Sequence, residues 1–73
     1  MSPEKLAYMA NQIGKFFAHQ QPEQAVVSIS DHLRKFWDPR MRREILAHCD
    51  DPGLHLDPLV QAAVARLRES QLT

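Results

Sequence analysis

The sequence contains a single cysteine, Cys49, in 73 residues. An internal disulfide framework is therefore excluded, and one unpaired thiol is typical of a reducing compartment. No apolar run approaches the roughly 20 residues that a membrane helix needs, and residues 1–5 lack the apolar core of a signal peptide. We therefore expect a soluble, cytoplasmic protein without a membrane segment.

Glycine is also scarce, because Gly14 and Gly53 are the only two in the chain. A glycine-rich phosphate-binding loop is thereby excluded. Metal-ligand spacings are missing too, since His48 and Cys49 are adjacent in a predicted helix and point about 100° apart. No serine stands in a motif of an activated nucleophile. The sequence thus predicts no catalytic residue, no metal site and no cofactor-binding residue in this chain.

The chain has no overall charge imbalance, since its formal net charge is zero. This balance argues against a general nucleic-acid binder. The charge is nevertheless uneven: residues 34–43 hold five basic residues and one acidic residue, a net charge of +4, whereas residues 1–33 and 44–73 sum to −1 and −3. Such a local excess of positive charge indicates a recognition surface.

Proline occurs five times, and four of these prolines mark predicted helix starts. Proline is tolerated at the first helical position, because its missing N–H would be unpaired there anyway. Ser2, Asp38 and Asp57 precede three of them as good N-cap residues, and Gln21 precedes the fourth as a poor one. Apolar residues then repeat at helical spacing behind each start. The pattern predicts four helices, at residues 3–18, 22–36, 39–47 or 49, and 58–68.

The predicted fold is all-α, a small bundle of four short helices in one domain at residues 1–73, with a frayed tail at about 70–73. The first two helices have matching apolar stripes and a short connector, so we expect an antiparallel hairpin followed by two shorter helices. Gly14 lies inside the first helix, where a close helix–helix contact would justify it. A chain this short buries a modest fraction of its surface, so we expect a partner or self-association to complete its core.

Four of the five phenylalanine, tyrosine and tryptophan residues lie near the ends of the first two predicted stripes. Phe16 and Phe17 close the first stripe, and Phe36 and Trp37 close the second. Because large aromatic side chains are usually buried, we expect Phe36 to belong at least partly to the core and Trp37 to cap it. The alternative is that Trp37 is partly exposed as an anchor in a protein interface.

Residues 36–43 combine the only tryptophan, a helix start and the densest positive charge. Arginines in the first turn of a helix oppose the helix dipole, so local helix energetics do not explain them. A carboxylate or phosphate on a partner would, because the planar guanidinium binds either group through two hydrogen bonds. The candidate partner-binding residues are Phe36, Trp37, Arg40, Arg42 and Arg43.

Two stretches of the sequence form distinctive motifs. The opening stretch is Leu6-x-x-Met9-Ala10-Asn11-Gln12-Ile13-Gly14-x-Phe16-Phe17. The central and more specific stretch is His32-Leu33-x-x-Phe36-Trp37-Asp38-Pro39-Arg40-Met41-Arg42. Both stretches resemble the delta subunit of NAD-dependent formate dehydrogenase. His48, Leu56, Pro58 and Val60 continue the match, so the resemblance covers about residues 6–67.

The resemblance implies a non-catalytic accessory subunit, without a redox centre of its own, in a soluble cytoplasmic enzyme complex. The catalytic alpha subunit of such a complex carries a molybdenum or tungsten pterin cofactor and iron–sulfur clusters, and other subunits carry flavin and bind NAD. The implied role is to support assembly, stability or maturation of the molybdopterin-containing subunit. Trp37, Arg40 and Arg42 match the family motif and acquire an interface role from it, whereas Arg43 is assigned by charge alone.

Two other functions remain open from the residues themselves. The basic patch at residues 34–43 is compatible with a small helical module that binds nucleic acid or regulates a partner, and binding to phosphates would depend steeply on salt. The isolated chain is also expected to be able to self-associate. We nevertheless predict binding to the catalytic subunit as the main function.

Overall fold

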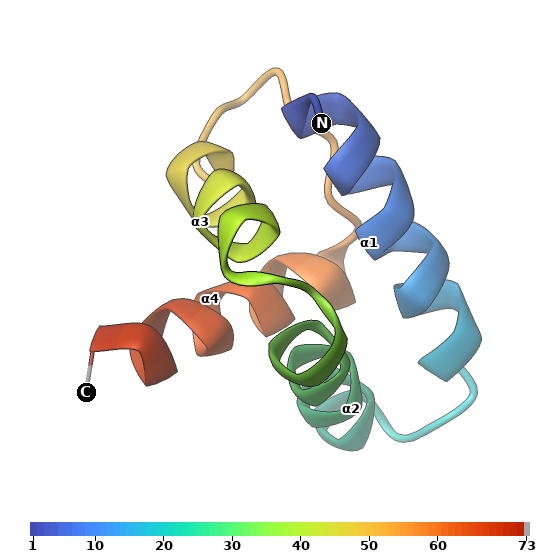
Figure 1. Cartoon of the computed structure of the whole chain (residues 1–73). Coiled ribbons are helices and arrows are strands. Elements are labelled where there is room, and N and C mark those ends of the chain that lie inside the picture. The colour runs from blue at the N-terminus through green and yellow to red at the C-terminus, as the bar shows by residue number, and fades with distance from the viewer. Residues whose placement is uncertain (73) are drawn as a thin grey trace.

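The computed structural model describes residues 1–72, with side chains for residues 1–70. Four helices and no strand occur in this part of the chain (Figure 1). They are α1 (Pro3–Phe17), α2 (Pro22–Phe36), α3 (Pro39–His48) and α4 (Pro58–Leu72). The predicted all-α class and all four helix starts are confirmed. Helix α4 continues to Leu72, past its predicted end at residue 68, and Thr73 lies outside the described residues.

Side-chain caps explain two of the helix starts. The Oγ atom of Ser2 accepts a hydrogen bond from the backbone N–H of Lys5 at 3.2 Å, and Oδ1 of Asp38 accepts one from the N–H of Met41 at 2.8 Å. Each bond satisfies one of the N–H groups that the first turn leaves unpaired. Gln21 makes no such bond before α2, as expected of a poor capping residue.

Asn11 fixes the start of α4 from a distance. Its Oδ1 atom accepts a hydrogen bond from the Asp57 backbone N–H, and its Nδ2 atom donates one to the carbonyl oxygen of His55, both at 2.9 Å. One side chain of α1 thus binds a backbone carbonyl and a backbone N–H of the loop before α4 and holds that loop in place. Asn11 lies outside the apolar stripe of α1, and this loop contact is its structural role.

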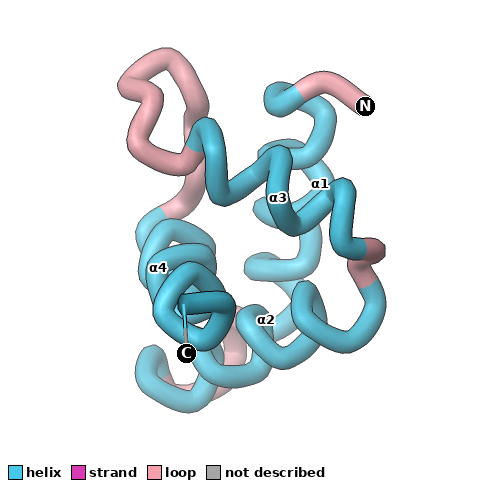
Figure 2. The backbone as a smooth tube through the Cα atoms, turned by 60° about the vertical axis from the view of Figure 1, so that its left-hand side comes forward, coloured by secondary structure: helices cyan, strands magenta, loops and turns pink. Residues whose placement is uncertain are grey.

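The four helices cross one another instead of forming a parallel bundle. In Figure 1, α1 lies across the view while α2 is seen nearly end-on, and Figure 2 shows the same crossing from another side. The expected antiparallel hairpin of the first two helices is therefore wrong. The reason is that α2 packs most extensively against α4 rather than α1. Ala25 in α2 and Ala63 in α4 are both fully buried.

Each of the four helices contributes to a single hydrophobic core. The side chains that are buried in it come from α1, α2, α3, α4 and the α2–α3 joint: Leu6, Ala10, Ile29, Leu33, Trp37, Ile45, Val60, Ala63, Val64 and Leu67. The apolar stripe predicted for α4 is confirmed by four of these residues. The core is therefore built largely by the residues that helical periodicity selects.

The buried face of α1 is turned away from Phe16, whereas Phe17 is half-buried and packs against the core. Ala7, Ala10 and Gly14 are buried, whereas Phe16 is 72% exposed. The expectation that Phe16 faces the core is wrong. Helical spacing gives the direction of a side chain, but the neighbouring helices come closest where α1 presents small residues, which leaves Phe16 at the uncovered edge of the stripe.

Gly14 marks a close approach between α1 and α4. A Cβ atom built on Gly14 would lie 2.5 Å from Cγ2 of Val60, and Val60 is fully buried. Because valine is branched at Cβ, its side chain has few rotamers into which it can retreat. The predicted helix–helix contact at Gly14 is confirmed, and it explains a glycine inside a helix.

Replacing Gly14 with alanine tests this contact. Alanine improves helix propensity by about 1 kcal/mol, but forcing a methyl group against Val60 costs typically 1–3 kcal/mol. We expect Gly14→Ala to lower the free energy of unfolding by up to about 2 kcal/mol, the difference between these two effects, measured by urea denaturation of the purified chain. In the Val60→Ala background the same substitution meets no Cγ2 atom, so it should be neutral or stabilising. An equal loss in both backgrounds would contradict the contact.

Candidate partner-binding surface

The two aromatic residues at the end of α2 have opposite environments. Trp37 is only 5% exposed and belongs to the core, whereas Phe36 is 73% exposed. The backbone leaves the helix at Trp37 in an extended conformation, with φ −81° and ψ 139°. Burial of Trp37 is thus confirmed and its alternative as an exposed anchor is contradicted. The expectation that Phe36 belongs at least partly to the core is wrong.

Arg42 has a partner inside the chain. Its Nη1 atom donates a hydrogen bond to the carbonyl oxygen of Arg34 at 2.5 Å, in the last turn of α2. The final carbonyl groups of a helix lack intrahelical partners and carry the negative end of the dipole, so a cation there is stabilising. The unfavourable position of Arg42 in its own helix is explained by this second helix. Its Nε atom is buried and has no hydrogen-bond partner among the described residues.

Of the other four basic residues at positions 34–43, one forms an ion pair with a described residue and three do not. Arg34 forms an ion pair with Asp31, with an Nη2–Oδ1 distance of 3.1 Å. Lys35, Arg40 and Arg43 are exposed and have no ion pair within the described part of the chain. We call these three residues the basic corner.

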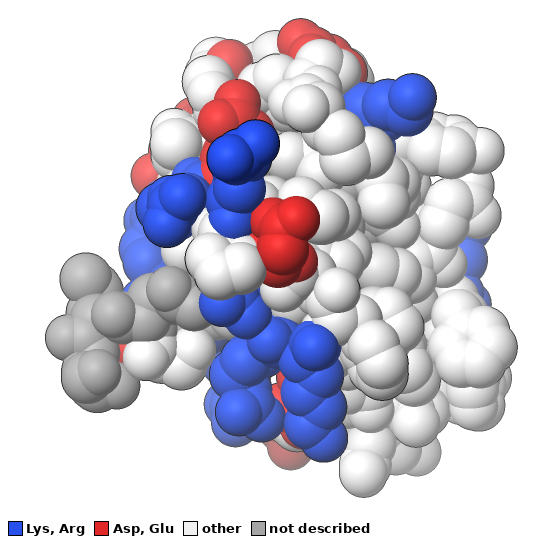
Figure 3. Space-filling view, in the orientation of Figure 1, with Lys and Arg blue, Asp and Glu red and all other residues white. Residues whose placement is uncertain are grey.

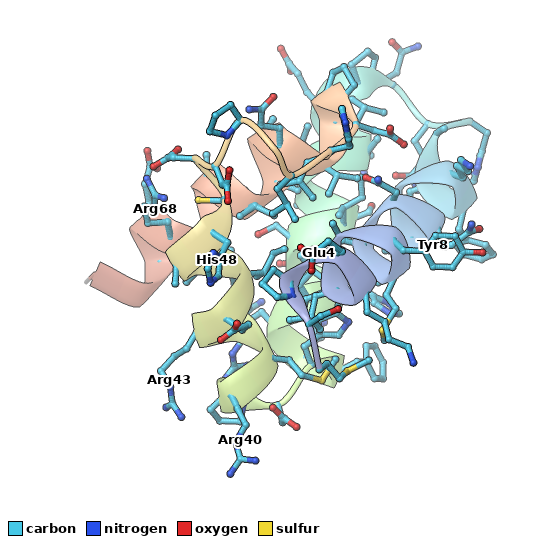
Figure 4. All side chains as sticks on the ribbon, turned by 90° about the horizontal axis from the view of Figure 1, so that it is seen from above. Glu4, Tyr8, Arg40, Arg43, His48 and Arg68 are labelled. Atoms are coloured by element: carbon cyan, nitrogen blue, oxygen red, sulfur yellow. The ribbon has the colours of Figure 1, made fainter. Side chains whose placement is uncertain are left out.

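The basic corner faces solvent at the joint between α2 and α3. Lysine and arginine side chains gather over α3 and the adjoining end of α2 in Figure 3, while the side of that face over α1 carries few charges. Arg40 and Arg43 both extend away from the bundle in Figure 4. Arg40 also lines a cavity of about 330 Å³, together with both apolar and charged residues. Its lining consists of Met1, Leu6, Asp38, Arg40, Met41 and Glu44.

A line of aromatic rings crosses from α1 to α2. The ring centroids of Phe16 and Phe17 are 5.0 Å apart, those of Phe17 and His32 are 6.2 Å apart, and those of His32 and Phe36 are 4.7 Å apart. We call these four residues the aromatic strip. Sequence reasoning missed it. The spacing of His32 and Phe36, one helical turn apart, was the available signal, but the contribution of α1 depends on how the two helices cross.

Polar contacts also gather where α3 ends. Arg68 donates from Nη2 to Oδ2 of Asp50 at 3.0 Å, and also to the Sγ atom of Cys49. The hydrogen bond to Asp50 raises the pKa of Arg68 above its ordinary value, and the nearby Cys49 side chain and the charge of Asp50 add to this shift. The guanidinium therefore stays protonated at physiological pH. These contacts tie the loop after α3 to α4.

The described residues offer no group of three or more histidine, cysteine or carboxylate side chains that would hold a metal ion. In that same part of the chain, every helix is too short or too polar to cross a membrane. The distinctive chemistry of this surface is thus aromatic and cationic. Fold and surface together define the chain as a small all-α protein with an exposed aromatic strip beside a basic corner.

Comparison with known proteins identifies the family of this chain. The model of the family described as NADH-dependent formate dehydrogenase delta subunit FdsD matches residues 5–64 of the chain. The match covers most of the sequence and both stretches singled out above, and the chain belongs to this family. No curated protein and no solved structure is similar enough to the chain to count as a match.

Two neighbouring arginines of α3 make a matched test of the structural assignment. We expect Arg42→Ala to lower the free energy of unfolding by about 1–2 kcal/mol, because it removes the cation from the end of α2 and leaves the Arg34 carbonyl without its partner. Arg43→Ala should change it by less than about 0.5 kcal/mol, as at other exposed positions. Chemical denaturation followed by circular dichroism measures both. Equal effects of the two substitutions would contradict the role given to Arg42.

Proposed function

We propose that this chain is a non-catalytic accessory subunit of a cytoplasmic NADH-dependent formate dehydrogenase. In this proposal it binds the catalytic alpha subunit and supports assembly, stability or maturation of that subunit, which carries the molybdopterin cofactor and iron–sulfur clusters. The observation that carries the proposal is the family match over residues 5–64, because the family is that of a delta subunit of this enzyme. Flavin and the NAD site would reside in other subunits.

The surface described above supports a binding role. Phe36, Arg40 and Arg43 project from the joint between α2 and α3, whereas Trp37 and Arg42 serve the chain's own fold. We therefore assign direct contact with the partner to the three exposed residues. Trp37 and Arg42 hold the joint in the shape that presents them. Aromatic and arginine side chains of this kind are the usual energetic centres of protein interfaces.

Co-expression of the tagged chain with the other formate dehydrogenase subunits tests the proposal. The catalytic subunit should co-purify with the wild-type chain. Replacing both Arg40 and Arg43 with alanine should weaken its retention about tenfold or more, because interface arginines commonly contribute at least ~1.4–2 kcal/mol. Arg66→Ala, which removes an exposed arginine from α4, is the matched control and should retain the subunit fully.

The outcomes separate the parts of the proposal. Failure of the wild-type chain to retain any formate dehydrogenase subunit would contradict the accessory role itself. Full retention by the double variant would contradict the assignment of the site alone. One copy of the chain in the purified, active enzyme would identify a permanent subunit, whereas its presence only on enzyme that lacks the molybdopterin cofactor would identify a maturation factor.

A further inference from the structure

We propose that the aromatic strip and the basic corner form one continuous docking surface for an amphipathic, acidic segment of a formate dehydrogenase subunit. The proposal rests on the accessory function above and extends the binding site from the α2–α3 joint across α2 onto α1. Its specific content is that Phe16, which lies twenty residues before Phe36 in the sequence, contacts the same partner.

The four rings are continuous and already ordered. Phe17 and His32 are half-buried, and they link the two outer rings, Phe16 and Phe36, through contacts of 4.7–6.2 Å. Rings that are held by their neighbours lose little conformational entropy when a partner binds. Aromatic side chains are favoured in interfaces for this reason, since they offer a large contact area for only two rotatable bonds. The strip is thus preorganised for contact.

The exposure of the outer rings is high for a folded protein. Phe16 is 72% and Phe36 is 73% exposed, and a phenylalanine side chain offers on the order of 150–250 Å² for burial. With the edges of Phe17 and His32 between them, the strip approaches the few hundred Å² of the larger apolar patches on soluble proteins, which are often functional. A partner that covers it gains a sizeable apolar contact.

The charges around the aromatic strip indicate which kind of partner segment would bind there. Lys15 precedes Phe16 and Lys35 precedes Phe36, and both lysines are exposed without an ion pair in the part of the chain that has side chains. Arg40 and Arg43 follow Phe36 on the other side of the joint. A matching segment therefore presents apolar side chains along the strip and carboxylates at its ends, because complementary charges favour the encounter and fix its register.

The same charges disfavour two other occupants. A second copy of the chain placed by a two-fold axis on this surface would bring the same patch against itself, so its cations would face each other. Bases of a single-stranded nucleic acid stack on exposed ring faces. In the strip, Phe16 meets Phe17 at an interplanar angle of 83° and Phe17 meets His32 at 63°, both edge to face, and only His32 and Phe36 are closer to parallel, at 38°. The four rings therefore do not provide a series of parallel platforms.

The deciding experiment replaces Phe16 and leaves the basic corner intact. In co-expressed complexes, Phe16→Ala should weaken retention of the formate dehydrogenase subunits by about tenfold or more, and Phe16→Gln should do the same. Tyr8→Ala is the matched control, because Tyr8 is another aromatic residue of α1, is 65% exposed and makes no ring contact with the strip. It should retain the subunits like the wild type. All three variants should melt within about 2–4 °C of the wild type, as expected of exposed positions.

Each result supports or overturns the proposal. Weaker retention with Phe16→Ala and Phe16→Gln but not with Tyr8→Ala supports it. Full retention with both Phe16 variants overturns it, and the accessory function survives if the wild type retains the subunits. Loss of a dimer of the isolated chain with intact complex formation would assign the strip to self-association. Loss of oligonucleotide binding with intact complex formation would assign it to nucleic acid, and either result overturns the proposal.

Discussion

Burial of Trp37 at the joint between α2 and α3 is the constraint on which the binding surface depends. The indole lies in the core at the point where the chain leaves α2 in an extended conformation. Asp38 then caps α3, and Arg42 reaches back to the last turn of α2. With the joint fixed in this way, Phe36 and the arginines Arg40 and Arg43 are directed outward. The central family-like stretch thus contains residues that fix the joint as well as exposed residues of the binding surface.

The opening family-like stretch likewise combines residues that hold the fold together with an exposed residue. Asn11 holds the loop before α4, and Gly14 admits Val60 of that helix. Phe16, in the same stretch, takes no part in the core. Each stretch therefore ties helices together through some of its residues and leaves one phenylalanine exposed. The aromatic strip joins these two exposed residues through Phe17 and His32.

Local interactions made the helix starts predictable, because a cap residue and a proline act within one turn. The stripes of α2 and α4 were predictable for a similar reason, since helical periodicity selects the side that meets a neighbour. Periodicity does not say which neighbour covers which part of a stripe, so Phe16 and Phe36 were placed in the core. The same limitation applied to Arg42, whose partner belongs to the preceding helix, and to the crossing of α1 and α2. These features depend on the packing of whole helices.

The most direct test of the docking surface is hydroxyl-radical footprinting of the chain, free and in the formate dehydrogenase complex. Phe16 and Phe36 should be oxidised readily in the free chain and protected in the complex. Tyr8 should remain reactive in both states, and Trp37 should be protected in both because it is buried. Equal oxidation of Phe16 and Phe36 in the free and assembled states would contradict the account.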